Sequence, residues 1–287
     1  MTKQPAFKRV ALMGRRRVSN IPETVQKLRD FLISQNVAVV MEMHTGQAIQ
    51  EKTLPLIETS ALKDHCDLII LVGGDGSMIN AAYVAITQNL PVLGVNRGRI
   101  GFLTDIHSEE LSKITAVLQG EYQLEERILL EAKLPGHQRI ALNDIVLLPG
   151  DAARMIDFEL FINDQFVCNQ RADGLIIATP TGSTAYALSA GGPLIEPDTD
   201  ALVLVPMFPY TLSSRPLVIP TTSKMEVVIS ARNETAPYAS SDGQEKIPLP
   251  PGTRIQIQTH SKRLQLIHPK DYDYFSTLRE KLGWNAR

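Results

Sequence analysis

The sequence predicts two domains of different class, an α/β domain followed by a β-rich domain. Up to about residue 120, apolar runs of strand length alternate with segments of helical spacing, which indicates an open, mostly parallel sheet with helices on both faces. The run Leu68–Val72 is apolar throughout, as expected for a strand buried on both faces. After residue 120, short alternating or apolar runs are separated by turn signals, which is typical of a β-rich domain. The length of 287 residues is sufficient for two cores.

The α/β half can be divided into elements by periodicity. Apolar side chains recur at helical spacing in 21–35, through Val25, Leu28, Phe31 and Leu32. In chain order we expect strands at 9–13, 37–41, 68–72 and 91–95, and helices at 21–35, 56–64, 77–87 and 108–118. Ligands of such sheets bind at the carboxyl ends of the strands. Residues 14–17, 73–77 and 96–102 should therefore share one rim.

The β-rich half shows Pro-Gly and Asp-Gly turn signals and a hairpin pattern centred on Asn163-Asp164. Further strands are expected at 227–230, 254–259 and 264–268, and a helical tail at 274–282 that packs back on the first domain. The expected domains are thus 1–120 (α/β), 121–268 (β-rich) and 269–287 (tail).

Composition narrows the class of protein. Basic and acidic residues nearly balance, at 29 and 31, so total charge predicts neither a nucleic-acid nor a membrane partner. The 44% hydrophobic and 21% charged fractions are those of a soluble globular protein. Cys66 and Cys168 lack the spacing of a disulfide framework or thiolate zinc site, and the histidines are scattered. No signal peptide or membrane-spanning run is recognisable, so a cytoplasmic location is expected.

The turn after Leu68–Val72 is the first candidate site. Gly73-Gly74-Asp75-Gly76 leads from a strand into a helix, a geometry that presents backbone N–H groups to phosphate. The carboxylate of Asp75 in such a turn suggests metal coordination or proton abstraction. The motif is neither a Walker loop nor a Gly-x-Gly-x-x-Gly fingerprint, and a glycine turn with one Asp also occurs as simple α/β punctuation.

Two further segments carry polar chemistry. Arg97 and Arg99, within 96–103, lie at the end of the next strand and are candidates to donate hydrogen bonds to a phosphate, although both could equally be solvated. The hydroxyl-rich run 179–184 follows a buried strand and could bind ribose or phosphate, or Ser183 could act only as a helix cap. Tyr186 offers a ring for stacking a base, or a core side chain.

A serine hydrolase is an alternative, because Ala187-Leu-Ser189-Ala-Gly191 approximates a nucleophile elbow. An elbow requires a strand directly before the serine and a helix after it. Here a polar loop precedes Ser189 and Gly191-Gly192-Pro193 follows it, so we reject this reading.

Taken in order and spacing, these motifs resemble the NAD kinase family over essentially the whole chain, and most closely its proteobacterial branch. The Gly-Gly-Asp-Gly motif is also found in diacylglycerol kinases, sphingosine kinases and phosphofructokinases, whereas 181–186 together with Asn143-Asp144 is specific to NAD kinases. The motifs that carry the resemblance are Gly73-Gly74-Asp75-Gly76, Asn96-x-Gly98-x-x-Gly101-Phe102-Leu103, Asn143-Asp144, Asp173-Gly174, Thr181-Gly-Ser-Thr-Ala-Tyr186 and His268-Pro-Lys-Asp-Tyr.

The resemblance implies ATP-dependent phosphorylation of the 2′-hydroxyl of the adenosine ribose of NAD, with a divalent cation, normally Mg²⁺. It also implies a Rossmann-like first domain, a β-sandwich second domain and a homo-oligomer, either dimer or tetramer. Asp75 matches the proton acceptor. The implied NAD-binding residues are Asp75, Gly76, Asn143, Asp144, Arg154, Arg171, Asp173, Thr181, Thr184, Ala185, Tyr186, Ala187, Leu188, Ser189 and Gln244, and the phosphate donor would meet Gly73, Gly74, Arg97 and Gly98.

Two positions depart from the family pattern. Ser77 stands where Thr or Asn is usual, and Arg99-Ile100 replaces a pair that usually contains Leu. Neither removes a functional group, but both lie near the implied donor site, so the resemblance leaves the preference for the phosphoryl donor open. A carboxylate that takes the proton of a ribose hydroxyl typically contributes ~10²- to 10⁴-fold in rate. We expect Asp75 to act in this way on a substrate held between the two domains. A lipid kinase that shares the Asp75 loop, or a non-catalytic NAD sensor, remains as the alternative.

Overall fold

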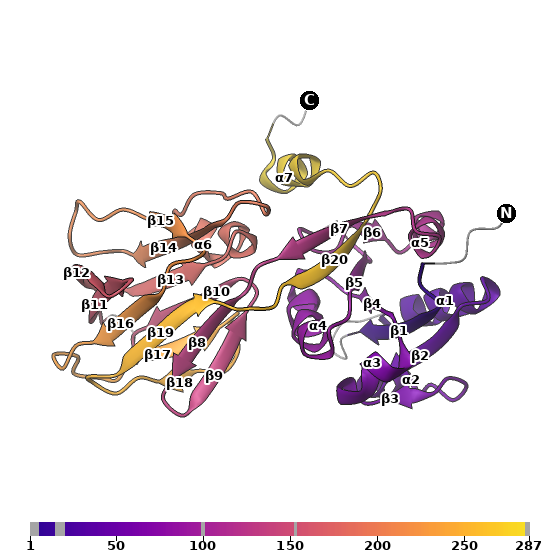
Figure 1. Ribbon diagram of the computed structural model, residues 1–287, viewed down its shortest axis with the longest axis horizontal. Coiled ribbons are helices and arrows are strands. Elements are labelled where there is room, and N and C mark those ends of the chain that lie inside the picture. The colour runs from indigo at the N-terminus through magenta and orange to yellow at the C-terminus, as the bar shows by residue number, and fades with distance from the viewer. Residues whose placement is uncertain (1–5, 15–20, 99–100, 152–153, 285–287) are drawn as a thin grey trace. The chain divides into compact units, whose positions relative to one another are not determined.

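The computed structural model describes residues 6–14, 21–98, 101–151 and 154–284 (Figure 1). The chain forms two compact units, one of Met1–Glu126 with Leu264–Arg287 and the other of Arg127–Arg263. The boundaries expected at 120 and 268 differ from these because two strands that flank the β-rich segment both belong to the first sheet.

The first unit contains an 8-stranded sheet in the order β3-β2-β1-β4-β5-β20-β7, with β6 paired to β5. The pairs β1–β2, β1–β4, β2–β3, β4–β5, β5–β6 and β5–β20 are parallel, so the mostly parallel sheet is confirmed. The strands are β1 Arg9–Gly14, β2 Ala38–Glu42, β3 Leu56–Ile57, β4 Leu68–Val72, β5 Val92–Asn96, β6 Ile106–His107, β7 Tyr122–Arg127 and β20 Leu264–Pro269.

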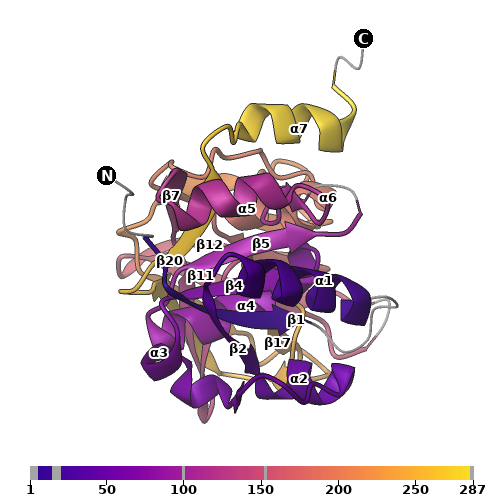
Figure 2. The ribbon, with the colours of Figure 1, turned by 90° about the vertical axis from the view of Figure 1, so that its right-hand side faces the viewer.

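Helices cover both faces of this sheet. In Figures 1 and 2, α1 and α5 lie on one side of the strands and α4 on the other. The helices of this unit are α1 Ile21–Ser34, α2 Met43–Ile49, α3 Leu62–His65, α4 Asp75–Gln88, α5 Leu111–Leu118 and α7 Tyr274–Leu282, with a 3-10 turn, η1, at Thr59–Ala61. The expected C-terminal helix is thus present.

Alternate residues of β4 explain its continuous apolar run. Leu68, Ile70 and Val72 join a core cluster that includes Val25 of α1 and Ile114 of α5. The intervening residues point to the opposite face, and the whole strand is buried. The expectation of a strand buried on both faces is confirmed.

Some local expectations for this unit were wrong. The predicted helix 56–64 is instead a short strand, β3, followed by the 3-10 turn and α3. Residues 43–49, for which no element was predicted, form α2, because the carboxylate of Glu42 accepts the N–H groups of His44 and Thr45 and caps the helix. The strand predicted at 264–268 exists, but it pairs in parallel with β5 rather than within the β-rich unit.

The second unit contains two 6-stranded sheets, ordered β15-β14-β13-β10-β17-β18 and β12-β11-β16-β19-β8-β9. Every strand pairing recorded within them is antiparallel. Their strands are β8 Leu130–Leu134, β9 His137–Ala141, β10 Asp144–Leu148, β11 Ile156–Ile162, β12 Gln165–Ala172, β13 Gly174–Ala178, β14 Ala201–Met207, β15 Leu217–Pro220, β16 Met225–Ile229, β17 Tyr238–Ser241, β18 Ile247–Pro248 and β19 Arg254–Thr259. A 3-10 turn, η2, at Thr181–Thr184 and helix α6 at Tyr186–Ser189 follow β13.

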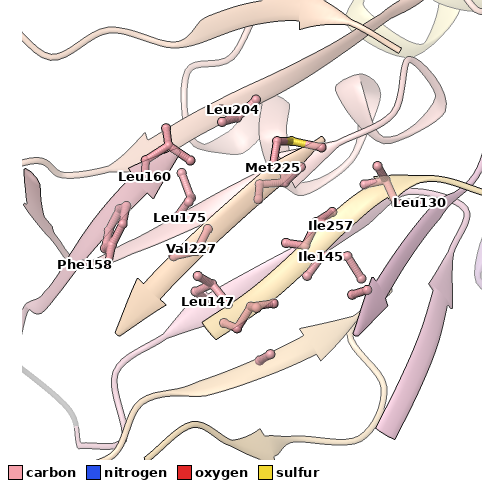
Figure 3. Close-up of a cluster of buried hydrophobic side chains, with 14 of the residues drawn as sticks. Leu130, Ile145, Leu147, Phe158, Leu160, Leu175, Leu204, Met225, Val227 and Ile257 are labelled. Carbon is pink, nitrogen blue, oxygen red and sulfur yellow. The ribbon is translucent and has the colours of Figure 1, made fainter. Parts of the chain in front are cut away.

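The inner faces of the two sheets form one core. Figure 3 shows Ile145 and Leu175 of one sheet facing Val227 and Ile257 of the other, and all four side chains belong to the same buried cluster. This packing confirms the expected β-sandwich. The hairpin at Asn163-Asp164 is also confirmed, since both residues have positive φ, 50° and 63°, as a tight hairpin turn requires. In the described part of the chain, no helix is long and apolar enough to cross a membrane.

Candidate functional site

Asp75 is the first residue of α4, directly after the turn that ends β4. Gly74 is the N-cap residue and has no side chain with which to cap the helix. Its carbonyl oxygen accepts the N–H of Ser77 at 2.8 Å and so begins the helical hydrogen bonding. The N-terminus of a helix concentrates unpaired N–H groups and a positive partial charge. The carboxylate of Asp75 therefore lies where an anion is favoured.

The segment after β5 holds this carboxylate. Oδ2 of Asp75 accepts the N–H of Phe102 at 2.9 Å, and Oδ1 accepts the N–H of Leu103 at 3.0 Å and the hydroxyl of Thr104 at 3.3 Å. A carboxylate offers about four lone-pair positions. Among the described residues Oδ2 accepts one hydrogen bond, so this oxygen can accept a further donor.

Gly101 is required for this close approach. A Cβ atom at residue 101 would lie 2.0 Å from Oδ1 of Asp75 and 2.7 Å from the hydroxyl of Thr104. Because β4 and β5 are parallel neighbours, their carboxyl ends meet at one edge of the sheet. The expected meeting of residues 73–77 with residues 96–102 is therefore confirmed.

Asn96 orders the other end of the same segment. Its Oδ1 accepts the N–H of Gly98 at 2.9 Å, and its Nδ2 donates to the hydroxyl of Thr104 at 2.9 Å. Arg97, which is half-buried, lies between Asn96 and Gly98. Arg99 and Ile100 lie outside the described residues, as do 15–17 of the segment expected on the same rim.

A second polar centre lies within the β-sandwich, where the carboxylate of Asp242 binds a turn. Its two oxygens accept the N–H groups of Leu142, Asn143 and Asp144 at 2.8, 2.8 and 3.1 Å. Asp242 has a positive φ of 49°. This interaction fixes the backbone of Asn143 and Asp144 where β10 begins.

Asp144 is buried beside Asp242. Burial, reinforced by the negative charge of Asp242, raises the pKa of Asp144 to about 7. Burial also raises the pKa of Asp242, although the N–H groups of 142–144 oppose this effect. Asp144 thus carries a carboxyl group that titrates near neutral pH.

These residues line a pocket of about 280 Å³. Tyr186, whose exposed fraction is 45%, borders it from α6. A pocket that combines an amide, a carboxyl group and an exposed aromatic ring suits hydroxyls and a planar base. The lining residues are Asn143, Asp144, Val146, Leu148, Ala185, Tyr186, Ser240, Asp242 and Gly243.

The hydroxyl-rich loop after β13 packs on the same turn. Thr179 donates its N–H to the carbonyl of Asn143 at 2.9 Å and its hydroxyl to that of Leu142 at 2.6 Å. A Cβ at residue 182 would lie 2.1 Å from the carbonyl oxygen of Asn143, so this close approach requires Gly182. The loop therefore packs against the turn that lines the pocket and holds that turn in place.

Several hydroxyls of this loop are engaged internally. Ser183 is fully buried, donates to the carbonyl of Pro180 at 2.6 Å and accepts the N–H of Ile195 at 3.0 Å. Thr181 accepts Nη1 of Arg127 at 3.2 Å. Thr184 donates to the carbonyl of Thr181 at 3.0 Å. Ser183 caps no helix with its side chain, so the helix-cap alternative for it was wrong.

The remaining predicted site residues lie elsewhere in the second unit. Arg154 and Arg171 line a polar pocket of about 430 Å³, where Arg154 pairs with Glu234, and Nε of Arg171 lies 4.0 Å from Asp157. Ser189 lines a third pocket, of about 410 Å³. Ala187 and Leu188 lie within α6, Asp173 separates β12 from β13, and Gln244 follows the turn at Gly243.

Sequence reasoning missed two residues that build these centres, Thr104 and Asp242. Asp242-Gly243 was read only as a turn signal, and the only available clue was the tolerance of Asp for positive φ. Thr104 gave no signal of its own. Among the described residues, no three Cys, His, Asp or Glu side chains form a group able to hold a metal ion.

Comparison with known proteins identifies the family. The ATP-NAD kinase N-terminal domain matches residues 10–122, and the ATP-NAD kinase C-terminal domain matches 142–269. An NAD kinase of Coxiella burnetii (strain RSA 493) is 53% identical over 289 residues, covering 99% of this chain and 97% of that protein. An NAD kinase of Pseudomonas fluorescens (strain Pf-5) is 45% identical over 287 residues, with coverages of 98% and 97%.

Solved structures agree with these sequence matches. Yeast NADH kinase complexed with NADH aligns with a TM-score of 0.87 at 26% identity, over 99% of this chain and 89% of that one. An NAD kinase from Archaeoglobus fulgidus in complex with ATP aligns with a TM-score of 0.73 at 26% identity, over 96% and 97%. The two domain models, the full-length relatives and the shared fold place the chain in the ATP-NAD kinase family.

Proposed function

We propose that this enzyme transfers the γ-phosphoryl group of ATP to the 2′-hydroxyl of the adenosine ribose of NAD, giving NADP. The chemistry rests on the carboxylate of Asp75, which lies at the N-terminus of α4 and is fixed by the backbone N–H groups of Phe102 and Leu103. Its Oδ2 can accept a hydrogen bond from a further donor. The family match to residues 142–269 favours a dinucleotide over a lipid as the acceptor. The intact Asp75 favours turnover over simple sensing of NAD.

In this proposal Asp75 is the general base. A ribose hydroxyl is a poor nucleophile at neutral pH, so removal of its proton as the new P–O bond forms lowers the barrier. Oδ2 accepts that proton, while the hydrogen bonds from Phe102 and Leu103 keep the carboxylate from rotating. In the same step the oxygen of the hydroxyl attacks the γ-phosphorus, and ADP leaves with the electron pair of the broken P–O bond.

The pocket at Asn143 and Asp144 binds the dinucleotide. The amide of Asn143 can donate and accept, the carboxyl of Asp144 can accept ribose hydroxyls, and the ring of Tyr186 can stack on a base. The remaining proposed NAD contacts are Gly76, Arg154, Arg171, Asp173, Thr181, Thr184, Ala185, Ala187, Leu188, Ser189 and Gln244.

ATP is proposed to bind with its phosphates at the turn before α4. Gly73 and Gly74 have no side chains, so a phosphate can approach the backbone of this turn closely. The helix N-terminus also favours anions. Arg97 and Gly98 follow β5 at the neighbouring edge and complete the proposed donor contacts.

A divalent cation, with Mg²⁺ as the first choice, is proposed to accompany ATP. Mg²⁺ is usually bound through substrate phosphates, waters and one or two carboxylates rather than by a protein cage. Such binding fits a chain in which the described residues form no three-ligand metal group, and we assign no protein ligand. When bound, the cation neutralises charge on the transferred phosphoryl group.

The enzyme is further proposed to form a homo-oligomer, either dimer or tetramer. Exposed apolar side chains in the second unit include Phe208, Tyr210 and Leu212, with exposed fractions of 77%, 73% and 92%. Grouped apolar exposure of this kind is usually covered by a partner.

The thiols of Cys66 and Cys168 are free, in keeping with a reducing, cytoplasmic location, which cell fractionation can test.

The reaction itself can be tested with purified protein. With NAD, ATP and Mg²⁺ we expect NADP, detected by an NADP-specific dehydrogenase, and we expect a chelator to abolish its formation. Diacylglycerol in place of NAD should give no phosphorylated product. Folded protein that formed no NADP at saturating substrates would contradict the proposed function.

Two substitutions separate the base from the binding pocket. Asp75→Asn keeps the shape but removes the base, so kcat should fall by ~10²- to 10⁴-fold while the Kd for NAD changes little. Tyr186→Ala removes a contact made in both ground and transition states, so it should mainly raise KM for NAD. Calorimetry and initial-rate kinetics measure both. A near-normal kcat with much weaker NAD binding in Asp75→Asn would show that Asp75 binds rather than catalyses.

The oligomer is tested by placing a charge within the exposed apolar group. Leu212→Asp should lower the molar mass measured by light scattering, because an interface cannot bury an unpaired carboxylate at low cost. Leu124→Asp, at a 52% exposed leucine of the first unit, is the matched control and should leave the mass unchanged. A wild-type protein that is monomeric at every concentration would disprove the oligomer.

A further inference from the structure

Buried charges adjoin the segment that holds Asp75. Thr104 contacts Asp75, and the next residue, Asp105, is 8% exposed. Oδ2 of Asp105 lies 2.9 Å from Nδ1 of His268, a residue of β20 that is 1% exposed. On the other side of the ring, Nε2 of His268 lies 2.8 Å from Oε2 of Glu125 of β7. One buried imidazole thus joins three segments of the first unit.

The two contacts define the protonation state of the ring. Each ring nitrogen lies within hydrogen-bond distance of a carboxylate oxygen, and an ionised carboxylate only accepts hydrogen bonds, so a doubly protonated ring satisfies both contacts. Burial lowers the pKa of His268, but the hydrogen bonds and charges of Asp105 and Glu125 outweigh this effect, and the pKa is raised above its usual value. The ring is therefore an imidazolium held between two carboxylates.

Asp105 depends on this cation. Its second oxygen, Oδ1, is buried and has no hydrogen-bond partner among the described residues. Removing the positive charge would leave a buried carboxylate without compensation, which is costly enough to displace it or make it take up a proton. Displacement of Asp105 would move Thr104 and the N–H groups of Phe102 and Leu103, which are the groups that orient Asp75.

We propose that His268 is a positioning residue for catalysis, whose imidazolium anchors segment 101–105 through Asp105 and thereby holds the Asp75 carboxylate in its reactive orientation. This inference rests on the proposed role of Asp75. His268 acts through the segment rather than on a substrate, so its loss should reduce kcat more than NAD affinity.

The sign of the pH dependence follows from the raised pKa. Below that pKa the imidazolium is intact and the segment is anchored. As pH rises through it, the ring loses one proton, and a bare nitrogen faces a carboxylate. The ring of Tyr272 is stacked on that of His268, with ring centroids 4.0 Å apart.

The central test replaces the cation with a neutral donor. His268→Gln can still donate to one carboxylate, and kcat should fall by about 10- to 100-fold while the Kd for NAD stays within about two-fold. The wild-type kcat should decline at high pH, and this limb should be missing from the variant. Glu125→Gln removes one of the two carboxylates, lowers the pKa of His268 and should shift the limb to lower pH. His260→Gln, at a partly exposed histidine of the second unit, is the matched control and should change neither quantity.

A readout independent of activity separates this inference from the proposed function. Amide hydrogen exchange at Phe102 and Leu103 should accelerate in His268→Gln, because their bonds to Asp75 open more often. The titration of His268, followed by NMR, should show its raised pKa in wild-type protein. Unchanged exchange together with unchanged kcat would overturn the inference, as would a high-pH limb that Glu125→Gln does not move. If exchange accelerated in His268→Gln and the pKa of His268 were raised in wild-type protein, but wild-type protein formed no NADP, only the proposed function would be refuted.

Discussion

The hydrogen bonds between the Asp75 carboxylate and the backbone of 102–103 are the constraint on which the proposed chemistry depends. They exist because β4 and β5 are parallel neighbours in the sheet, with Val72 opposite Val95, so that the turns that follow them emerge side by side. Gly101 leaves room for the carboxylate, and Asn96 and Thr104 order the remainder of the segment. A base must be held within a fraction of an ångström of its proton donor, and loops alone rarely provide such precision.

Carboxylates bound by backbone N–H groups occur in both units, and Asp75 and Asp242 are two examples. Asp242 accepts three N–H groups, and these bonds commit it to shaping the turn at 142–144. Asp75 accepts two N–H groups, and its Oδ2 can accept one more donor. Asp144 differs from both, as a buried carboxyl group whose pKa of about 7 makes its charge sensitive to a bound ligand. In the proposed function the same residue type thus serves as base in Asp75 and binding group in Asp144, while Asp242 supports the turn.

Local patterns predicted much of this arrangement. The apolar run of β4, its glycine turn and the repetition of that plan after β5 were sufficient to place Asp75 beside 96–102, because parallel strands impose that proximity. The Asn163-Asp164 hairpin was equally readable, since its turn chemistry is local. The reaction was predicted from the resemblance of the motifs to the NAD kinase family.

Other features depend on contacts distant in sequence and could not be read from local pattern. β20 has the composition of any β strand, and only its pairing with β5 assigns it to the first sheet. His268 belongs to a family motif but had no predicted role, and its partners are Asp105 and Glu125, 163 and 143 residues away. Ser183 occurs in a run of hydroxyls but is turned inward, toward Pro180 and Ile195.

The central claim is that catalysis requires the orientation of Asp75 and not merely its presence. Gly101→Ala tests it most directly, since the new Cβ would enter the space of Oδ1 while the carboxylate itself remains. Measured by initial rates at saturating NAD and ATP, kcat should fall by ~10²-fold, with NAD affinity unchanged by calorimetry. A Gly101→Ala enzyme with wild-type kcat would contradict the account.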